Sequence, residues 1–469
     1  MATIYSNGVN SLRRRMDDLS KIKLKTRDDI LNLFTPTSPI TEAIKFAGRS
    51  KPLEDLTDGL VTKGADIILF GERGCGKTSL ANMLHDLATG HLELLDYYDL
   101  RQRLERKGYR LFFSTTERKQ FNVIWVRGAG RKLEEVINSA LTRRKEKHFG
   151  PGLLYYLPTE ADQIEVSAKI GFDKVFTSET ELKEIHTSPK PINIKEGFEL
   201  ALQRYANTYK QELLIIVDEF ETVSDRQEMS QYMKSFENVR FVLVGVAEVT
   251  FDLLREHSSV ARDIFGIKLG PMMDDELRQI IDIGSAILSP NYSFHPYAIE
   301  QIVKTSYGSP YWCHFFARAL ITHELELAGS AEFFLTPPKP RDFTKEDVDL
   351  LIASLPTRAD CMLFEEALKL LTMQDETTAK ILLCIARHSE GVISSATICS
   401  TLESEGISKA DIMETIEGFL KLSNAPFAER SRIRDIVSFS FVDPNLKKYI
   451  LIRNAGLGTR SKRLVLQDW

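Results

Sequence analysis

The sequence predicts an α/β protein in which a doubly wound parallel sheet is followed by domains that are mostly helical. Through residue 270, short apolar runs typical of buried strands are separated by longer stretches of helix formers. Beyond Pro271 the apolar residues recur at helical spacing instead. The last part of the chain predicts three helices and then an extended pair of segments, which is the order of a winged helix.

Length and composition limit the class of protein. The 469 residues predict about two to four domains, and 43% apolar with 27% charged residues is typical of a soluble globular protein. A net charge of −5 excludes a strongly basic nucleic-acid coat protein, so any DNA contact would need a local patch. The five cysteines form no C-x-x-C pair, and the chain shows neither a secretory core nor a membrane-length apolar run. These features predict a cytoplasmic protein with reduced thiols and no membrane partner.

Residues 71–78 read G-E-R-G-C-G-K-T and match the phosphate-binding pattern G-x-x-x-x-G-K-[ST]. The apolar run 66–70 predicts a strand before this loop, and Ser79 begins a stretch of helix formers after it. Backbone N–H groups of such a loop surround phosphates at the positive end of a helix. We expect Lys77 to reach the β- and γ-phosphates and the Thr78 hydroxyl to bind Mg²⁺. The expected nucleotide contacts are Gly71, Glu72, Arg73, Gly74, Cys75, Gly76, Lys77, Thr78 and Ser79.

A second apolar run, 213–217, ends in Asp218 and Glu219. Ligands of a doubly wound sheet bind at the carboxyl ends of its strands. We therefore expect Asp218 beside the Mg²⁺ held by Thr78, and Glu219 as the base that deprotonates an attacking water. The alternative is an ordinary acidic turn at the end of a strand.

The remaining segments complete the predicted domains. Further strands are expected at 122–126, 239–244 and 264–269, a decorating hairpin near 160–180, and helices at 133–141 and 198–209, whereas 90–120 has no clear period. A helix capped by Thr344 is expected after a proline-rich linker. The predicted domains are a charged arm (1–30), the sheet domain (31–270), a helical lid (271–335), a linker and helix (336–375), the winged helix (376–453) and a basic tail (454–469).

With these motifs in place, residues 34–452 resemble AAA+ P-loop ATPases of the origin-recognition-like and STAND-related branch, of the bacterial ATP-binding type. Phe46-Ala47-Gly48-Arg49 is similar to the family's F-x-G-R box near the adenine, which makes ATP the expected nucleotide. Gly308-Ser309-Pro310 is similar to the G-x-P motif of the lid; the alternative is a plain turn between helices.

The resemblance also implies an oligomer. Arg262 stands where the family places an arginine finger for the neighbouring subunit; the alternative is a surface ion pair. The chain departs from the family near Glu248, where the usual Asn, Thr or Ser sensor is absent. It departs again at Tyr311-Trp312, which replace a lid arginine unless Arg318 serves. Trp312, Phe315 and Phe316 are expected to pack the lid.

The winged helix is the open question for function. Its expected recognition helix carries Asp411, Glu414 and Glu417 along one face, which disfavours sequence reading in DNA. Cations in the wing and tail would suit either a DNA backbone or a partner protein, and we favour protein contacts. These cations are Arg430, Arg432, Arg434, Arg460, Lys462 and Arg463.

The sequence thus predicts an ATP-hydrolysing switch that oligomerises and acts on a separate effector protein, with bacterial signalling or antiphage defence as the expected setting. One alternative is a DNA loader or transposition-type ATPase. The other is a module that binds nucleotide with little turnover.

Overall fold

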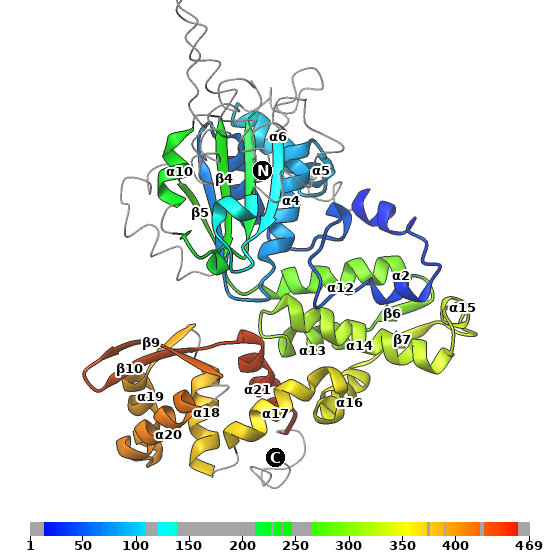
Figure 1. The fold of residues 1–469 in the computed structure, drawn as a ribbon. Helices are drawn as coiled ribbons and strands as arrows, with labels where there is room; N and C mark the ends of the chain where they lie inside the picture. Colours follow the sequence, from blue (N-terminus) through cyan, green and yellow to red (C-terminus); the bar gives the residue numbers. More distant parts are fainter. Residues whose placement is uncertain are drawn as a thin grey trace, which may run out of the picture. The chain divides into compact units, whose positions relative to one another are not determined.

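The computed structural model describes residues 14–108, 121–137, 202, 212–226, 229–236, 238–245, 264–372, 376–388, 391–422 and 426–457, which fall into two compact units (Figure 1). The first unit contains Ser50–Gly71 and Lys77–Leu269, and the second contains Leu12–Arg49 and Gly270–Trp469. Residues Glu72–Gly76 of the phosphate loop cluster with the second unit. The expected hairpin at 160–180, Glu248, Arg262 and the cations of the tail lie outside the described residues.

A five-stranded sheet forms the centre of the first unit, and its fully parallel pairing confirms the predicted α/β class. The strand order is β2-β3-β4-β1-β5, so β4 separates the two strands that carry the predicted motifs. The central strands β1, β3 and β4 are buried, as expected where helices cover both faces of a sheet. The strands are β1 Asp66–Gly71, β2 Asn122–Arg127, β3 Leu213–Asp218, β4 Val239–Gly245 and β5 Ile264–Leu269.

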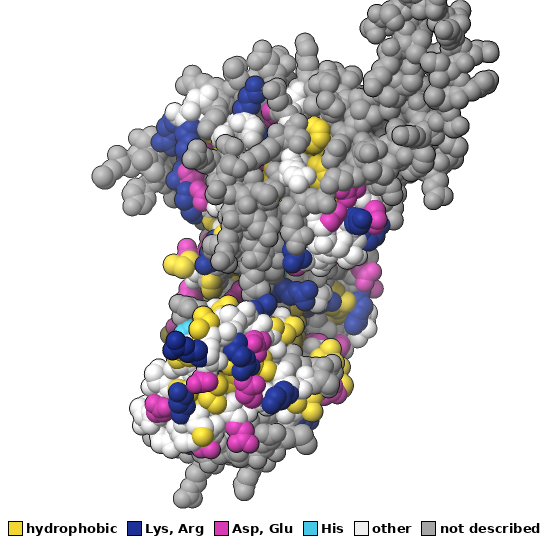
Figure 2. All heavy atoms as spheres, turned by 60° about the vertical axis from the view of Figure 1, so that its left-hand side comes forward, with side chains coloured by type: hydrophobic (Ala, Val, Ile, Leu, Met, Phe, Trp, Pro, Cys, Tyr) yellow, Lys and Arg dark blue, Asp and Glu magenta, His cyan; other side chains and the backbone are white. Residues whose placement is uncertain are grey.

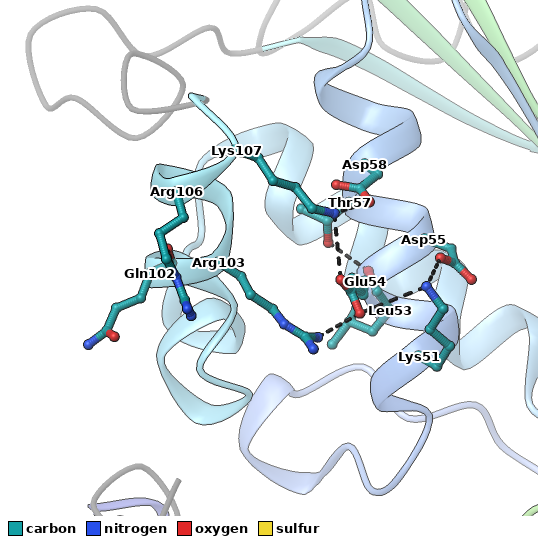
Figure 3. Close-up of polar contacts among 10 residues, drawn as sticks. All are labelled: Lys51, Leu53, Glu54, Asp55, Thr57, Asp58, Gln102, Arg103, Arg106 and Lys107. Atoms are coloured by element: carbon teal, nitrogen blue, oxygen red, sulfur yellow. Dashed lines mark hydrogen bonds and ion pairs between the residues drawn. The ribbon is translucent and has the colours of Figure 1, made fainter. Parts of the chain in front are cut away.

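Two helices of the first unit lie in the segment 90–120, whose sequence has no clear period. One of them, α6, is held against α3 by ion pairs centred on Glu54 (Figure 3). Arg103 Nη1 lies 2.6 Å from Glu54 Oε2, and Lys107 Nζ lies 2.6 Å from Asp58 Oδ2. The elements are α3 Ser50–Val61, α4 Lys77–Thr89, α5 Glu93–Tyr97, α6 Leu100–Arg106, η4 Phe220–Thr222 and α10 Met229–Ser235, and residues 133–137 are helical too.

A buried arginine organises the amino end of the sheet. Arg240, near the start of β4, donates hydrogen bonds to the carbonyls of Gly59, Leu60 and Ala65 at 2.6–2.9 Å. Two of these carbonyls belong to the last turn of α3, where the helix itself leaves acceptors unsatisfied. Its Nη1 also lies 3.5 Å from Glu212 Oε2, so the buried cation is paired as well as hydrogen-bonded.

The second unit begins with helices that match the predicted lid. Trp312, Phe315 and Phe316 on α14 are buried, which confirms that they pack the lid. Thr344 caps α16 through a hydrogen bond from Asp347 N–H, as expected. The elements are α2 Arg27–Leu31, η1 Ala43–Lys45, α12 Asp274–Leu288, β6 Tyr292–Phe294, α13 Pro296–Thr305, α14 Pro310–Ala328, α15 Ala331–Leu335, β7 Arg341–Phe343, α16 Lys345–Ser354, η6 Leu355–Thr357, η7 Ala359–Cys361 and α17 Met362–Thr372.

The winged-helix order is found in the last part of the chain, with one strand more than predicted. The wing hairpin β9–β10 is joined by β8, in the order β8-β10-β9. None of the described helices is long and apolar enough to cross a membrane. The elements are α18 Glu376–Arg387, β8 Val392–Ser394, α19 Ser395–Leu402, η8 Glu403–Glu405, α20 Lys409–Lys421, β9 Phe427–Ile433, β10 Ile436–Phe441 and α21 Pro444–Leu457.

Candidate nucleotide site

The loop between β1 and α4 has the backbone that a phosphate-binding loop needs. Gly74 and Gly76 have φ angles of +76° and +95°, in the left-handed region that glycine adopts without strain. A Cβ on Gly76 would meet nothing within 4 Å, so its backbone conformation, not lack of space, requires glycine there. Lys77 is the first residue of α4, and its Nζ donates to the Gly71 carbonyl at 3.0 Å. The lysine side chain therefore returns to the last residue of β1, and Thr78 and Ser79 follow it in the first turn of α4.

Thr78 and Asp218, predicted separately from two motifs, contact each other in the first unit. Thr78 Oγ1 donates to Asp218 Oδ2 at 3.1 Å. Asp218 is the last residue of β3 and only 3% exposed. Burial raises the pKa of its carboxyl, whereas hydrogen bonds from Glu219 N–H and Thr78 oppose that shift. A hydroxyl and a carboxylate side by side are the oxygen ligands that Mg²⁺ uses beside phosphates, so these residues fit the metal.

Glu219 begins the turn after β3 in an uncommon conformation. Its φ of +54° is left-handed although it is not glycine, and its N–H donates to Asp218 Oδ1 at 3.0 Å. The hydroxyl of Thr222 donates to the Glu219 carbonyl at 2.8 Å and closes the turn. The Glu219 side chain is exposed, and its carboxylate makes no hydrogen bond to any residue that the structure describes. Backbone strain of this kind is common where a side chain must be aimed at a ligand.

Two glycines that the sequence reasoning missed hold this turn. A Cβ on Gly128, just after β2, would lie 2.3 Å from Thr222 Oγ1 and 2.6 Å from the Glu219 carbonyl oxygen. A Cβ on Gly245, the last residue of β4, would lie 2.9 Å from Glu221 Oε2. Neither distance leaves room for a side chain, so the turn fits closely between the ends of β2 and β4. In the sequence, each of these glycines stands at the end of an apolar run that predicts a strand, and this position could have pointed to them.

The F-x-G-R segment contacts the phosphate loop within the second unit. Arg49 Nη2 donates to the Cys75 carbonyl at 2.8 Å, and burial lowers the pKa of its guanidinium. Gly48 and Arg49 have φ angles of +61° and +59°, and their N–H groups donate to Gln279 and Glu276 of α12. Arg49 therefore contacts the backbone of the phosphate loop, and its place near an adenine stays a prediction.

The remaining loop residues face helices of the second unit that the sequence did not connect with them. Glu72 Oε2 lies 3.9 Å from Lys448 Nζ of α21, and burial lowers the pKa of that lysine. A Cβ on Gly74 would lie 3.3 Å from Asn445 Nδ2 of α21 and 3.7 Å from Tyr311 Cβ of α14. Arg73 is exposed. Neither motif analysis nor spacing pointed to α21.

The lid motif forms a close turn between two helices. The Gly308 carbonyl accepts from Met272 N–H at 2.8 Å, and a Cβ on Gly308 would lie 2.6 Å from Pro271 Cβ. Its φ of +73° also requires glycine. Pro310 occupies the first turn of α14, where a missing N–H costs nothing. Gly308 and Pro310 stand three residues and one residue before Tyr311, the lid residue beside Gly74.

No family model and no curated protein matches the chain. Among solved structures it is similar to the Walker-type ATPase of Pyrococcus abyssi (16% identity, TM-score 0.41, 89% of this chain and 99% of that chain). It is also similar to Cdc6p from Pyrobaculum aerophilum (10%, 0.41, 91% and 98%) and to the ADP form of the Aeropyrum pernix ORC2 protein (12%, 0.45, 92% and 98%).

Proposed function

We propose that this chain binds ATP with Mg²⁺, hydrolyses it, and uses the cycle as a switch on a partner protein. The hydrogen bond between Thr78 and Asp218 carries the proposal. It brings the first turn of α4 to the end of β3, although their sequence positions lie 140 residues apart. A phosphate loop alone would support binding; the adjacent carboxylates support turnover.

The residues of the site have separate tasks in this proposal. The N–H groups of the glycine loop and the Lys77 ammonium would hold the β- and γ-phosphates. Thr78 and Asp218 would hold Mg²⁺, which supplies positive charge to the phosphate oxygens when bound. Glu219, whose side chain is exposed and whose carboxylate makes no hydrogen bond to the described residues, would accept the proton of the attacking water.

Contacts inside the second unit support the switch. Arg49 binds the carbonyl of Cys75, while Lys448 and Asn445 of α21 lie against Glu72 and Gly74. A phosphate entering the loop would compete for the same groups, and α21 belongs to the winged helix. We propose that the winged helix passes the nucleotide state to a separate effector, in bacterial signalling or antiphage defence, and that Arg262 completes the neighbouring subunit's site in an oligomer.

The DNA-loading alternative has less support from the wing. Arg432 lies 2.5 Å from Glu417 Oε1 and 2.6 Å from Glu429 Oε2, and Arg430 donates to Ser440 Oγ at 2.8 Å. Arg430 and Arg432 belong to β9, whereas Arg434 lies in the hairpin turn after β9 ends, so the three arginines do not line one strand face. On the face shown in Figure 2, Lys and Arg side chains lie interspersed with Asp and Glu. A cation that is already paired with a carboxylate binds a phosphate backbone weakly, because the neighbouring negative charge repels the phosphates.

Lys77→Ala tests binding. Removing the ammonium should abolish ATP–Mg²⁺ binding measured by titration calorimetry, while the thermal midpoint without nucleotide stays unchanged because Lys77 is not a core residue. Lys63→Ala, which removes an exposed lysine just before β1, is the matched control and should bind as the wild type does. Wild-type affinity in Lys77→Ala would disprove the loop assignment.

Glu219→Gln tests hydrolysis. The variant should bind ATP normally but release phosphate at least about a hundredfold more slowly, the scale for loss of a general base. Glu135→Gln, which neutralises an exposed glutamate after β2, should keep the wild-type rate. No turnover in the wild type would favour the binding module instead.

A further inference from the structure

The carboxyl end of β4 occupies the middle of the candidate site. In the sheet order β2-β3-β4-β1-β5, β4 lies between the strand that ends at Asp218 and the strand that ends at Gly71. Gly245 pairs in register with Phe70, one residue before the phosphate loop begins. The last residues of β4, Val244 and Gly245, bring no polar side chain to this place. Among the described residues, the end of β4 therefore offers no polar side chain to a γ-phosphate and its attacking water.

Glu221 fills this place from the neighbouring turn. It lies in η4, three residues after Asp218, and its Oε2 is 2.9 Å from the position of a Cβ on Gly245. The carboxylate thus occupies the space into which a side chain at the end of β4 would project. Gly245 is not among the residues with positive φ, so the nearby carboxylate, not backbone conformation, accounts for the glycine.

One oxygen of the Glu221 carboxylate is buried without a hydrogen-bond donor from the described residues. This oxygen is Oε2, which lies beside Gly245. The backbone carbonyl of Glu221, by contrast, accepts a hydrogen bond from Arg226 Nη1 at 3.1 Å. A buried carboxylate oxygen without a donor is costly, so such groups in native proteins usually await a ligand, a water or an ion.

We propose that Glu221 positions the attacking water for hydrolysis, in the place where β4 offers no polar side chain; this inference rests on the proposed ATPase function. The water donates one O–H to Glu219 and the other to Glu221, which directs its lone pair at the γ-phosphorus. The water oxygen forms a bond to phosphorus while the bond from phosphorus to the β,γ-bridging oxygen breaks. Glu219 takes the proton, and ADP leaves with the electrons of the broken bond. Glu221 keeps its charge throughout and acts as a positioning residue.

A set of four variants tests this role by separating turnover from binding. In single-turnover measurements Glu221→Gln should slow phosphate release about ten- to a hundredfold, the scale of a misplaced reactant, with unchanged ATP affinity by calorimetry. Glu221→Ala should be at least as slow. Gly245→Ser alone should also be slow, because its Cβ would collide with Glu221. The double variant Glu221→Ala with Gly245→Ser should regain at least threefold over Glu221→Ala, because the serine hydroxyl enters the vacated space and binds the water.

The outcomes distinguish this inference from the proposed function. Glu135→Gln serves as the carboxylate control and should keep the wild-type rate. If Glu219→Gln is slow while Glu221→Gln turns over at the wild-type rate, the ATPase stands and the positioning role is wrong. A joint loss of ATP affinity and thermal stability in Glu221→Gln, with no gain in the double variant, would make Glu221 structural and overturn the inference. Absence of turnover in the wild type would overturn both.

Discussion

The charged side chains at the two ends of the central sheet differ in how far their hydrogen-bonding groups are satisfied within the fold. At the amino end, Arg240 is 1% exposed, donates to three backbone carbonyls and pairs with Glu212. At the carboxyl end, the side chain of Glu219 is exposed without a described hydrogen bond, and Glu221 has a buried oxygen without a described partner. Both ends belong to the same unit and the same strands.

This difference separates charges that hold the fold from charges that await a ligand. A buried ion that is hydrogen-bonded and paired within the fold contributes to a unique structure and is not available to a substrate. A carboxylate held in place by backbone contacts but short of donors is arranged for something that is not part of the chain. Parallel sheets concentrate the second kind at their carboxyl ends, where the loops leave the strands.

The largest effect should come from a charge that a neighbouring subunit adds to the carboxyl end. Arg262→Ala should leave ATP affinity unchanged but lower hydrolysis roughly a thousandfold, the scale of arginine fingers. Specific activity of the wild type should rise with protein concentration, since only assembled sites are complete. The measurement is steady-state phosphate release across a dilution series.

Mixing two inactive proteins provides the control for this effect. Lys77→Ala subunits keep Arg262 and should restore some activity to Arg262→Ala subunits, whose loops are intact. Flat specific activity on dilution, with no gain on mixing, would show that Arg262 is a surface ion-pair partner and that each chain works alone.

Arg240→Met should give the next effect, on stability alone. Methionine retains most of the volume but leaves Glu212 and three carbonyls without their cation, which should lower the free energy of unfolding by about 3–5 kcal/mol. Urea unfolding followed by circular dichroism measures the loss. Phosphate release per folded molecule should stay at the wild-type rate. A large fall in that rate under conditions where the variant is fully folded would show that Arg240 also serves the nucleotide site, and the two ends of the sheet would not differ in the way described.

The smallest effect is expected for Arg432→Ala in the wing. Its ion pairs with Glu417 and Glu429 are exposed, and exposed pairs contribute little because water and salt screen them. Binding to duplex DNA, measured by filter retention at two salt concentrations, should be weak and unchanged by the substitution. Tight binding with a steep salt dependence that Arg432→Ala reduces would favour the DNA-loading function.

The sequence predicted the strands well because buried parallel strands are short apolar runs. Residues 264–269 were predicted with the bounds that β5 has, and 213–217 fell one residue short of Asp218. The contact between Thr78 and Asp218 followed from the motifs, since carboxyl ends of parallel strands lie at one edge. Local pattern carries this information because each strand must bury its own side chains.

Other parts of the site depend on contacts between residues that are far apart in sequence, and the spacing of motifs along the chain does not predict such contacts. Glu221 belongs to none of the sequence motifs, and its position beside Gly245 depends on β3 and β4 being neighbours in the sheet. The turn of Arg49 onto the Cys75 carbonyl and the contact of Lys448 with Glu72 join segments far apart in sequence. The short strands β6, β7 and β8 were also missed, because three residues show no measurable period.

The close fit of the Glu219–Thr222 turn between Gly128 and Gly245 has a thermodynamic consequence. Because the turn is immobilised when the sheet forms, its conformational entropy is lost during folding and not again in each catalytic cycle. The barrier to hydrolysis should therefore be mainly enthalpic, with an Eyring plot whose intercept shows little activation entropy. A side chain at position 128 would loosen the turn and shift that intercept before it altered the affinity for nucleotide.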